Sequence, residues 1–287
     1  MANKGLRSRR VMANGVNTHY SESGDDGPVI LALHGGGAGS SGESGMGLVM
    51  PLLADDFRVI APDSVGGYGD TDPFAPVPYG LINRVSHIED FVDALCLDRF
   101  TLTGNSQGAW AAVRYACLHP ERVERLILIS SLTIAQGLGI DQPRTAALAA
   151  LESYDGTREG MRKLLEALII DKSRITDALI DRRQNSATRP GAVEAAKQFA
   201  KNTGAARKNP LLAMQFDLRA TLPALAEQIP TIFIWGNEDT FALPETGKAI
   251  EKAIPKIMFY WVPGAGHQVQ TDAPKESADI MRRFARS

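Results

Sequence analysis

The chain has 287 residues, of which 44% are hydrophobic and 22% are charged, a composition typical of globular proteins. Its 31 basic and 33 acidic residues nearly cancel, to a formal net charge of -2, and form no basic stripe. This balance argues against a nucleic acid or an anionic membrane as the partner and favours a small molecule. No apolar run approaches the eighteen or so residues that a membrane-spanning helix needs.

The length suits one large domain, or a core that carries an inserted subdomain. The N-terminal segment MANKGLRSRR leads into no apolar stretch of the kind found in secretory signals. Cys96 and Cys117 lie in segments with helical patterns and are expected to be reduced and buried. These features predict a cytoplasmic protein.

The strand pattern begins with a hairpin, since short alternating runs flank Asn14-Gly15. Short apolar runs rich in β-branched and aromatic residues follow, separated by helix-period segments or loops, which is typical of parallel strands buried on both faces. The pattern predicts an α/β fold with a mostly parallel sheet. The predicted strands are Val29–Leu33, Arg58–Ala61, Phe100–Thr103, Leu126–Ser130, Thr231–Trp235 and Met258–Val262.

A long helical block interrupts this alternation from about residue 140 to residue 220. The helical patterns there are Thr145–Tyr154, Gly160–Ile170, Ile175–Gln184 and Ala192–Lys201. We expect residues 140–220 to form a helical cap (lid) inserted over the sheet, with residues 1–139 and 221–287 as the core. The alternative is two crossover helices joined by long loops, and such loops are uncommon in compact domains.

A nucleophile motif follows the strand Phe100–Thr103. The sequence Gly104-Asn105-Ser106-Gln107-Gly108 is a G-x-S-x-G motif, and the helical stretch Ala109–Leu118 comes next. A serine at a sharp, strained turn needs neighbours of minimal bulk, and the helix directs its positive end at developing negative charge. We therefore expect Ser106 to be the nucleophile; the alternative is an ordinary tight turn.

A glycine run, Gly35-Gly36-Gly37, follows His34 and the strand Val29–Leu33. Without Cβ atoms, backbone N–H groups in such a loop can approach a reacting carbonyl. We expect the oxyanion hole to consist of the N–H groups of Gly36 and Gln107. His34 could be a catalytic base, but its place directly before the glycines favours a structural histidine. Phosphate binding is not favoured, because neither GxxxxGK[ST] nor GxGxxG with a later ribose-binding acid is present.

A serine hydroxyl needs a neighbouring base that accepts its proton. In a G-x-S-x-G hydrolase the order is serine, acid, histidine, so the base lies late in the chain. His267 follows the strand Met258–Val262 and satisfies this order, whereas His119 closes the helix that starts beside Ser106 and points away.

The acid candidate follows the strand Thr231–Trp235. Asp239 is preferred over its neighbour Glu238, which we expect to be solvated, and Asp217 and Asp272 follow no strand in the right order. A carboxylate beside the imidazole holds its tautomer and stabilises the imidazolium.

The motifs HGGGAG, GNSQG, GNED and GAGH together resemble the meta-cleavage product hydrolases of the α/β-hydrolase superfamily. The resemblance runs from about Asn14 to Phe284 and includes the segment Thr157–Met161. It implies the α/β-hydrolase fold and serine-dependent hydrolysis of a carbon–carbon bond in a 2-hydroxy-6-oxo-hexa-2,4-dienoate, a product of aromatic ring meta-cleavage. The sequence implies no metal or organic cofactor, since no cluster of metal ligands appears in it, and the resemblance suggests a homodimer.

Carried over by position, the resemblance makes Asn105 a ligand of the dienoate end and Arg183 the group that meets the substrate carboxylate. It also places Gly35, Ser44 and Gln268 at the substrate.

The spacing of Ile175, Leu179 and Arg183 independently puts the arginine on the apolar face of its helix, where a guanidinium needs an anion. Arg182 is the alternative ligand. A solvated turn formed by Asp181, Arg182 and Arg183 is the alternative structure.

The chain departs from the family pattern at three places. Gln268 replaces a tryptophan, Gln107 replaces an apolar residue, and Ser44-Gly45 replace a segment that carries an asparagine. These changes keep open an ester, lactone or thioester hydrolase. A non-hydrolytic use of the fold, as in cofactor-free dioxygenases or hormone receptors, is disfavoured because the serine and both oxyanion donors are retained.

Overall fold

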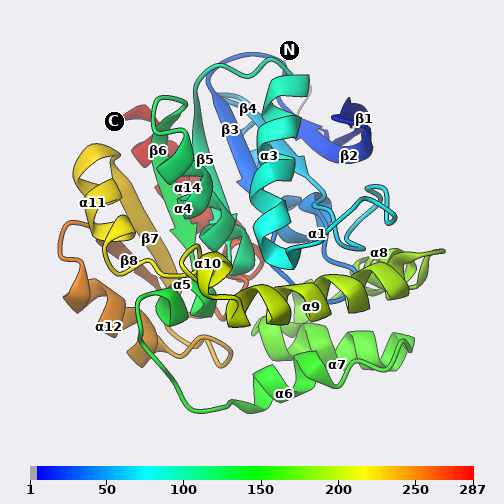
Figure 1. The fold of residues 1–287 in the computed structure, drawn as a ribbon. Coiled ribbons are helices and arrows are strands. Elements are labelled where there is room, and N and C mark those ends of the chain that lie inside the picture. Colours follow the sequence, from blue (N-terminus) through cyan, green and yellow to red (C-terminus); the bar gives the residue numbers. More distant parts are fainter. Residues whose placement is uncertain (1–4) are drawn as a thin grey trace.

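The computed structural model describes residues 5–287. Residues 1–4, which begin both the predicted core and the N-terminal segment discussed above, lie outside the described part. Within it, one eight-stranded sheet has the order β1-β2-β4-β3-β5-β6-β7-β8 (Figure 1). The hairpin strands β1 (Arg7–Ala13) and β2 (Val16–Ser23) are antiparallel, β2 is antiparallel to β4, and the remaining pairs are parallel.

The predicted hairpin and all six predicted parallel strands are confirmed, with ends that differ by at most three residues. Asn14 and Gly15 both have positive φ, 45° and 84°, as the two central residues of a type I′ turn require. The parallel strands are β3 (Val29–Leu33), β4 (Arg58–Pro62), β5 (Phe100–Asn105), β6 (Val123–Ile129), β7 (Thr231–Gly236) and β8 (Met258–Val262).

Helices cover both faces of the sheet, and each face has its own apolar cluster. One face packs against α3 (Asn83–Ala94), α4 (Gln107–Leu118), α11 (Thr221–Gln228) and α12 (Pro244–Ala253). The other packs against α1 (Gly42–Met46), α2 (Met50–Leu53) and α14 (Pro274–Arg286). The short helices η1 (Gly80–Ile82) and α13 (Val269–Asp272) lie in the connections.

Residues 140–220 contain helices but no strand, as the sequence predicts. Figure 1 shows α6 to α9 gathered beyond one end of the sheet. Threonine side chains cap three of these helices, because Thr145, Thr157 and Thr176 each accept a backbone N–H of the first turn. The helix α5 (Leu132–Gly137) precedes this block. The helices of the block are α6 (Ala146–Glu152), α7 (Arg158–Leu168), η2 (Lys172–Arg174), α8 (Asp177–Thr188), α9 (Ala192–Lys208) and α10 (Pro210–Ala213).

The expectation for the cysteines is only partly right. Both carry free thiols, but Cys96 is exposed and follows α3 with φ of 51°, while Cys117 is half-buried at the end of α4. The pattern was misread because α3 ends at Ala94, two residues before Cys96.

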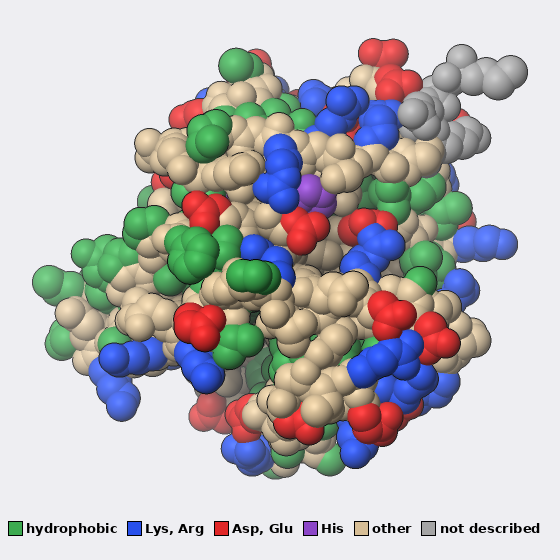
Figure 2. Space-filling view, turned by 90° about the vertical axis from the view of Figure 1, so that its right-hand side faces the viewer, with side chains coloured by type: hydrophobic (Ala, Val, Ile, Leu, Met, Phe, Trp, Pro, Cys, Tyr) green, Lys and Arg blue, Asp and Glu red, His purple; other side chains and the backbone are tan. Residues whose placement is uncertain are grey.

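Two surface features bear on partners. On the face in Figure 2, acidic and basic side chains are interspersed rather than separated by sign, as the near-zero net charge suggests. Among the helices of residues 5–287, none has the length and apolarity to cross a membrane.

Candidate active site

Ser106 stands at the sharp turn between β5 and α4. Its φ and ψ are 57° and -119°, a strained conformation for a residue with a side chain. The turn is held from behind, because the Ser106 N–H donates to the carbonyls of Ile129 and Ser130 at 3.0 and 3.1 Å. The Ser106 carbonyl also accepts the hydroxyl of Ser131 at 2.7 Å. The backbone strain is therefore supported by the end of the neighbouring strand β6.

The two motif glycines are required by close backbone packing. A Cβ on Gly104 would lie 2.4 Å from the backbone of Gly108, and a Cβ on Gly108 would lie 2.5 Å from the carbonyl oxygen of Leu33. Real Cβ atoms do not approach so closely. The G-x-S-x-G pattern thus follows from how tightly the turn sits against β3 and the start of α4.

The N–H groups of Gly36 and Gln107 are available at the front of this turn. Among residues 5–287, neither group donates to a backbone acceptor outside its own helix or strand. Gln107 is the first residue of α4, so the partial positive charge at the N-terminus of the helix strengthens its N–H as a hydrogen-bond donor. The geometry suits an oxyanion hole at the positions that the sequence predicts.

His34 lies behind the glycine loop. Its Nδ1–H donates to the Gly35 carbonyl at 2.7 Å, and its Nε2 accepts the Ser64 N–H at 3.0 Å. Burial, helped by the positive charge of Arg84, lowers the pKa of His34 to about 3. A neutral imidazole with both nitrogens engaged fits the structural role rather than that of a base.

Arg84 of α3 is buried beneath the same loop. Its guanidinium donates to the carbonyls of His34 and Gly35 at 3.3 and 3.4 Å, and its Cζ lies 4.3 Å from the ring centroid of Tyr68. No carboxylate among residues 5–287 forms an ion pair with it, and burial lowers its pKa. The Gly35 carbonyl belongs to the same amide group as the Gly36 N–H, so two donors polarise that amide.

His267 and Asp239 meet at the ends of β8 and β7. The imidazole Nδ1 donates to Oδ2 of Asp239 at 2.9 Å, and the two residues are 4% and 1% exposed. Oδ1 of Asp239 accepts the N–H groups of Phe241 and Ala242, each at 2.8 Å. Both carboxylate oxygens thus accept hydrogen bonds. Because Nδ1 of His267 carries the proton that it donates to Asp239, Nε2 is the nitrogen with a free lone pair.

The rejected alternatives lie elsewhere. Glu238 is exposed, Asp217 pairs with Arg219 at the surface, and His119 lies 2.6 Å from Glu89.

Asp272 has a supporting role that the sequence did not reveal. It accepts the N–H groups of Gly266 and Asp171, each at 2.8 Å, and so anchors the loop before His267.

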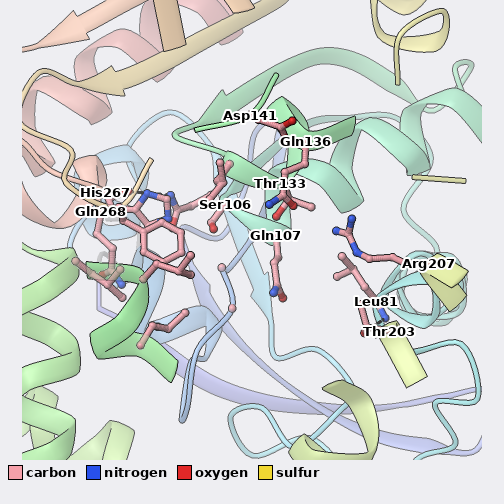
Figure 3. Close-up of a pocket in the computed structure, with 18 residues that line it drawn as sticks. Leu81, Ser106, Gln107, Thr133, Gln136, Asp141, Thr203, Arg207, His267 and Gln268 are labelled. Atoms are coloured by element: carbon pink, nitrogen blue, oxygen red, sulfur yellow. Dashed lines mark hydrogen bonds between the residues drawn. The ribbon is translucent and has the colours of Figure 1, made fainter. Parts of the chain in front are cut away.

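Ser106 and His267 line one cavity of about 630 Å³ (Figure 3). Within residues 5–287 no hydrogen bond joins the serine hydroxyl to the imidazole. Catalytic hydrogen bonds are often open without substrate and tighten when it binds.

Three predicted substrate ligands, Gly35, Asn105 and Gln268, line this cavity. The Asn105 amide N–H groups donate to the carbonyls of His267 and Ile129 at 3.0 and 3.3 Å. Asn105 therefore also ties the histidine loop to the nucleophile strand.

Arg183 is turned inward, as predicted, but it is not among the residues that line the cavity. Its Nε and Nη2 donate to the Ala38 carbonyl at 3.2 and 2.8 Å, and burial lowers its pKa to about 10. The solvated-turn alternative is wrong for Arg183, while Arg182 is the exposed residue and pairs with Glu43.

Ser44 is the second predicted ligand, after Arg183, that is not among the residues that line the cavity. It lies in α1, where its Oγ accepts the Ser41 N–H at 2.9 Å in a capping box. The short helix turns this side chain back on its own N-terminus.

Sequence reasoning missed the cavity wall contributed by α5, the loop that follows α5, and α9. The side chains there follow no motif and are brought in only by the fold: Thr133, Gln136, Asp141, Thr203 and Arg207. Among residues 5–287, Arg207 is the one Lys or Arg side chain that lines the cavity.

Within residues 5–287, no group of three or more His, Cys, Asp or Glu side chains lies close enough together to hold a metal ion.

The chain matches the family model for the alpha/beta hydrolase fold over residues 28–274. It is 32% identical over 280 residues to 2-hydroxy-6-oxo-6-(2'-aminophenyl)hexa-2,4-dienoic acid hydrolase of Metapseudomonas resinovorans, covering 96% of this chain and 90% of that protein. It is also 32% identical to 2-hydroxy-6-oxo-2,4-heptadienoate hydrolase of Pseudomonas putida F1, over 96% and 95%.

Among solved structures, the meta-cleavage product hydrolase of Pseudomonas fluorescens IP01 is similar, with a TM-score of 0.76 and 28% identity over 96% of each chain. The match covers the sheet and the helical block alike. The chain therefore belongs to the alpha/beta hydrolase family and, within it, resembles the meta-cleavage product hydrolases.

Proposed function

We propose that this enzyme hydrolyses a carbon–carbon bond in a 2-hydroxy-6-oxo-hexa-2,4-dienoate, with Ser106 as nucleophile, His267 as base and Asp239 as the residue that orients it. The names of the similar hydrolases support the substrate class. The observation that carries the chemistry is the arrangement of the residues: a strained Ser106 and His267, whose imidazole is held by the buried Asp239, border one cavity.

The reaction begins with the dienoate in the cavity beside Asn105 and Gln268. A proton moves to C5 as the dienol becomes the keto form, so that the fragment bearing C5 can leave as a stabilised carbanion. Ser106 then attacks the C6 carbonyl, and Nε2 of His267 takes the hydroxyl proton. Nδ1 stays bonded to Asp239, which stabilises the imidazolium.

The tetrahedral oxyanion lies against the N–H groups of Gly36 and Gln107. His34 and Arg84 donate to the amide that carries the Gly36 N–H, which strengthens this donor. The C5–C6 bond breaks, and its electron pair passes along the conjugated chain to the C2 oxygen. The imidazolium of His267 gives its proton back to this oxygen, and the fragment leaves as 2-hydroxypentadienoate. Water then hydrolyses the acyl–serine ester and releases a carboxylic acid.

Arg183 is proposed to attract the dienoate carboxylate from behind the glycine loop. Its guanidinium packs against this loop, because a Cβ on Gly37 would lie 3.3 Å from its Nη2. Nε and Nη2 are used by Ala38, whereas Nη1 forms no hydrogen bond within residues 5–287. A buried guanidinium with one free edge suits a carboxylate.

Residues 140–220 are proposed to act as the cap, with residues 1–139 and 221–287 as the hydrolase core. Leu148, Leu151 and Leu168 of this block line the cavity with Ser106, so it would exclude water from the reacting carbon.

We further propose that the enzyme works in the cytoplasm as a homodimer. The free thiols fit a reducing compartment, and β8 leaves an open sheet edge at which Met258 is exposed. A monomer mass by light scattering at micromolar concentration would contradict the dimer.

The test of the bond class compares two substrates. We expect a yellow 2-hydroxy-6-oxo-dienoate to lose its absorbance with the wild-type enzyme and not with Ser106→Ala, while the exposed-serine control Ser86→Ala retains activity. Rapid hydrolysis of a p-nitrophenyl ester without dienoate consumption would instead support an ester hydrolase. Inertness toward both would contradict both functions.

A further inference from the structure

The catalytic cavity differs in character on the two sides of Ser106. In Figure 3, His267 and Gln268 lie on one side of the nucleophile, and Arg207 and Thr203 lie on the other. Thr133 and Gln107 stand between Ser106 and this second group. Leu81 also lies beside Arg207 and Thr203. We call Gln107, Thr133, Thr203 and Arg207 the polar end of the cavity.

Arg207 is held in place without an acidic partner. It lies in the last turn of α9, and its Cζ stands 4.4 Å from the ring centroid of Phe216. Among residues 5–287, no carboxylate comes within ion-pair distance of it, although Asp141 lines the same cavity. Arg207 is an exposed residue of α9, and the partial desolvation of its guanidinium lowers its pKa. In Figure 3 its guanidinium reaches from the helix toward Thr133.

A second polar group at this end also lacks a partner. The side-chain oxygen of Gln107 is buried and accepts no hydrogen bond within the described chain. The side chain lies against the oxyanion loop, because a Cβ on Gly36 would be 2.6 Å from its Cδ. A cation without an acidic partner at the wall of a cavity is typical of a site that takes its anion from a ligand, whereas the amide oxygen of Gln107 is an acceptor and needs a donor group of that ligand.

We propose that Arg207 binds a carboxylate at the far end of the substrate's acyl fragment, so that the preferred substrate is a dioate. This rests on the proposed function, in which the dienoate lies beside Asn105 and Gln268. The acyl fragment must then extend from Ser106 in the opposite direction, toward Arg207. Hydrolysis would release a dicarboxylic acid, with the new carboxylate formed at Ser106 and the original one at Arg207.

A neutral acyl fragment fits this end less well. It would cover the guanidinium without supplying an anion, and covering an unpaired charge is costly. An acyl fragment that ends in a carboxylate offers Arg207 a charge-assisted pair and can accept a hydrogen bond from the hydroxyl of Thr133, whereas the hydroxyl of Thr203 already donates to the Phe199 carbonyl at 2.8 Å. The polar end therefore selects the acyl fragment by charge.

The test uses two p-nitrophenyl esters that differ only in the end of the acyl chain. These are p-nitrophenyl valerate, which is neutral, and mono-p-nitrophenyl glutarate, which ends in a carboxylate. We expect the wild-type enzyme to have the higher kcat/KM for the glutarate ester. In Arg207→Gln this constant falls at least tenfold for glutarate, mostly through KM, and changes less than twofold for valerate. Arg207→Lys retains part of the preference, and Arg207→Glu reverses it.

Lys201→Gln is the matched control, since it removes a charge from an exposed position of the same helix α9. It should leave the ratio of the two constants unchanged. An equal loss for both esters in Arg207→Gln, or no change in their ratio, would overturn the proposal.

The ester pair reads out the serine chemistry without any carbon–carbon cleavage. Suppose that the enzyme consumes no dienoate but prefers the glutarate ester in a way that depends on Arg207. This result would contradict the proposed carbon–carbon bond cleavage and would still support carboxylate binding by Arg207. If the enzyme consumes the dienoate but Arg207→Gln does not change the ratio of the two ester constants, carboxylate binding by Arg207 would be contradicted. The proposed carbon–carbon bond cleavage would still be supported.

Discussion

Replacing Asp239 by asparagine would favour the tautomer of His267 that cannot act as a base toward Ser106. In the structure, Oδ1 of Asp239 accepts two backbone N–H groups, from Phe241 and Ala242, and Oδ2 faces Nδ1 of His267. The oxygen of an asparagine would keep the two N–H donors, so its NH₂ group would face Nδ1. Nδ1 must then accept, Nε2 carries the proton, and no lone pair remains for the hydroxyl of Ser106.

The magnitude follows from the cost of the opposite orientation. Turning the amide round would leave two buried N–H donors unpaired, at about 1–3 kcal/mol each. The productive tautomer is thus disfavoured by about 2–6 kcal/mol, and the imidazolium also loses its carboxylate. We expect kcat to fall by about 10³ to 10⁴, near the roughly 10⁴-fold loss for this change in serine proteases. The melting temperature should change little, because the side chain keeps its size and its two N–H contacts.

The assay is steady-state hydrolysis of the dienoate or of a p-nitrophenyl ester, with ¹⁵N NMR of His267 to identify the protonated nitrogen. Glu238→Gln, which removes the exposed neighbouring carboxylate, is the control and should keep wild-type kcat. A variant Asp239→Asn that keeps more than a tenth of kcat, or that still carries its proton on Nδ1, would refute the reasoning.

Two further predictions concern groups buried near the oxyanion loop. In Arg84→Met, the peptide group that carries the Gly36 N–H loses a hydrogen-bond donor, and we expect kcat to fall roughly tenfold at nearly constant KM, equivalent to about 1.4 kcal/mol. The control is Arg189→Met, at another arginine that donates to backbone carbonyls, and it should keep wild-type kcat. Equal losses of kcat in both variants would contradict the role of Arg84. The pKa of His34 is lowered to about 3 and that of His87 to about 4, each mainly by burial, from an ordinary 6.5. Below pH 6.5 the unfolded chain therefore binds protons that the folded chain does not, and the free energy of unfolding should decrease as the pH falls toward 4, by up to about 1.4 kcal/mol per pH unit for each histidine. Urea titrations at pH 7 and 5.5 measure this change in the free energy of unfolding. The variant His87→Gln should lose about half of the dependence on pH. A free energy of unfolding that increases as the pH falls would contradict the prediction.

The sequence by itself determined the features that depend on short stretches of chain. The six parallel strands were readable because strands buried on both faces are continuous apolar runs. The turn at Ser106 was readable because its geometry needs glycines at fixed distances along the chain. The pairing of His267 with Asp239 was also predictable, since each residue follows a strand and parallel strands end at the same edge of the sheet.

Only the tertiary structure decided which other side chains reach the cavity. Spacing predicted that Arg183 points inward, but not that the Ala38 carbonyl takes up two of its nitrogens. Ser44 was placed at the substrate by position, and the capping box of α1 turns it away. Arg207 belongs to no motif and reaches the cavity because the helices of residues 140–220 pack over the sheet end. A motif records the local backbone that the chemistry of Ser106 demands, whereas the substrate pocket is formed by residues far apart in the sequence, so its composition follows from packing.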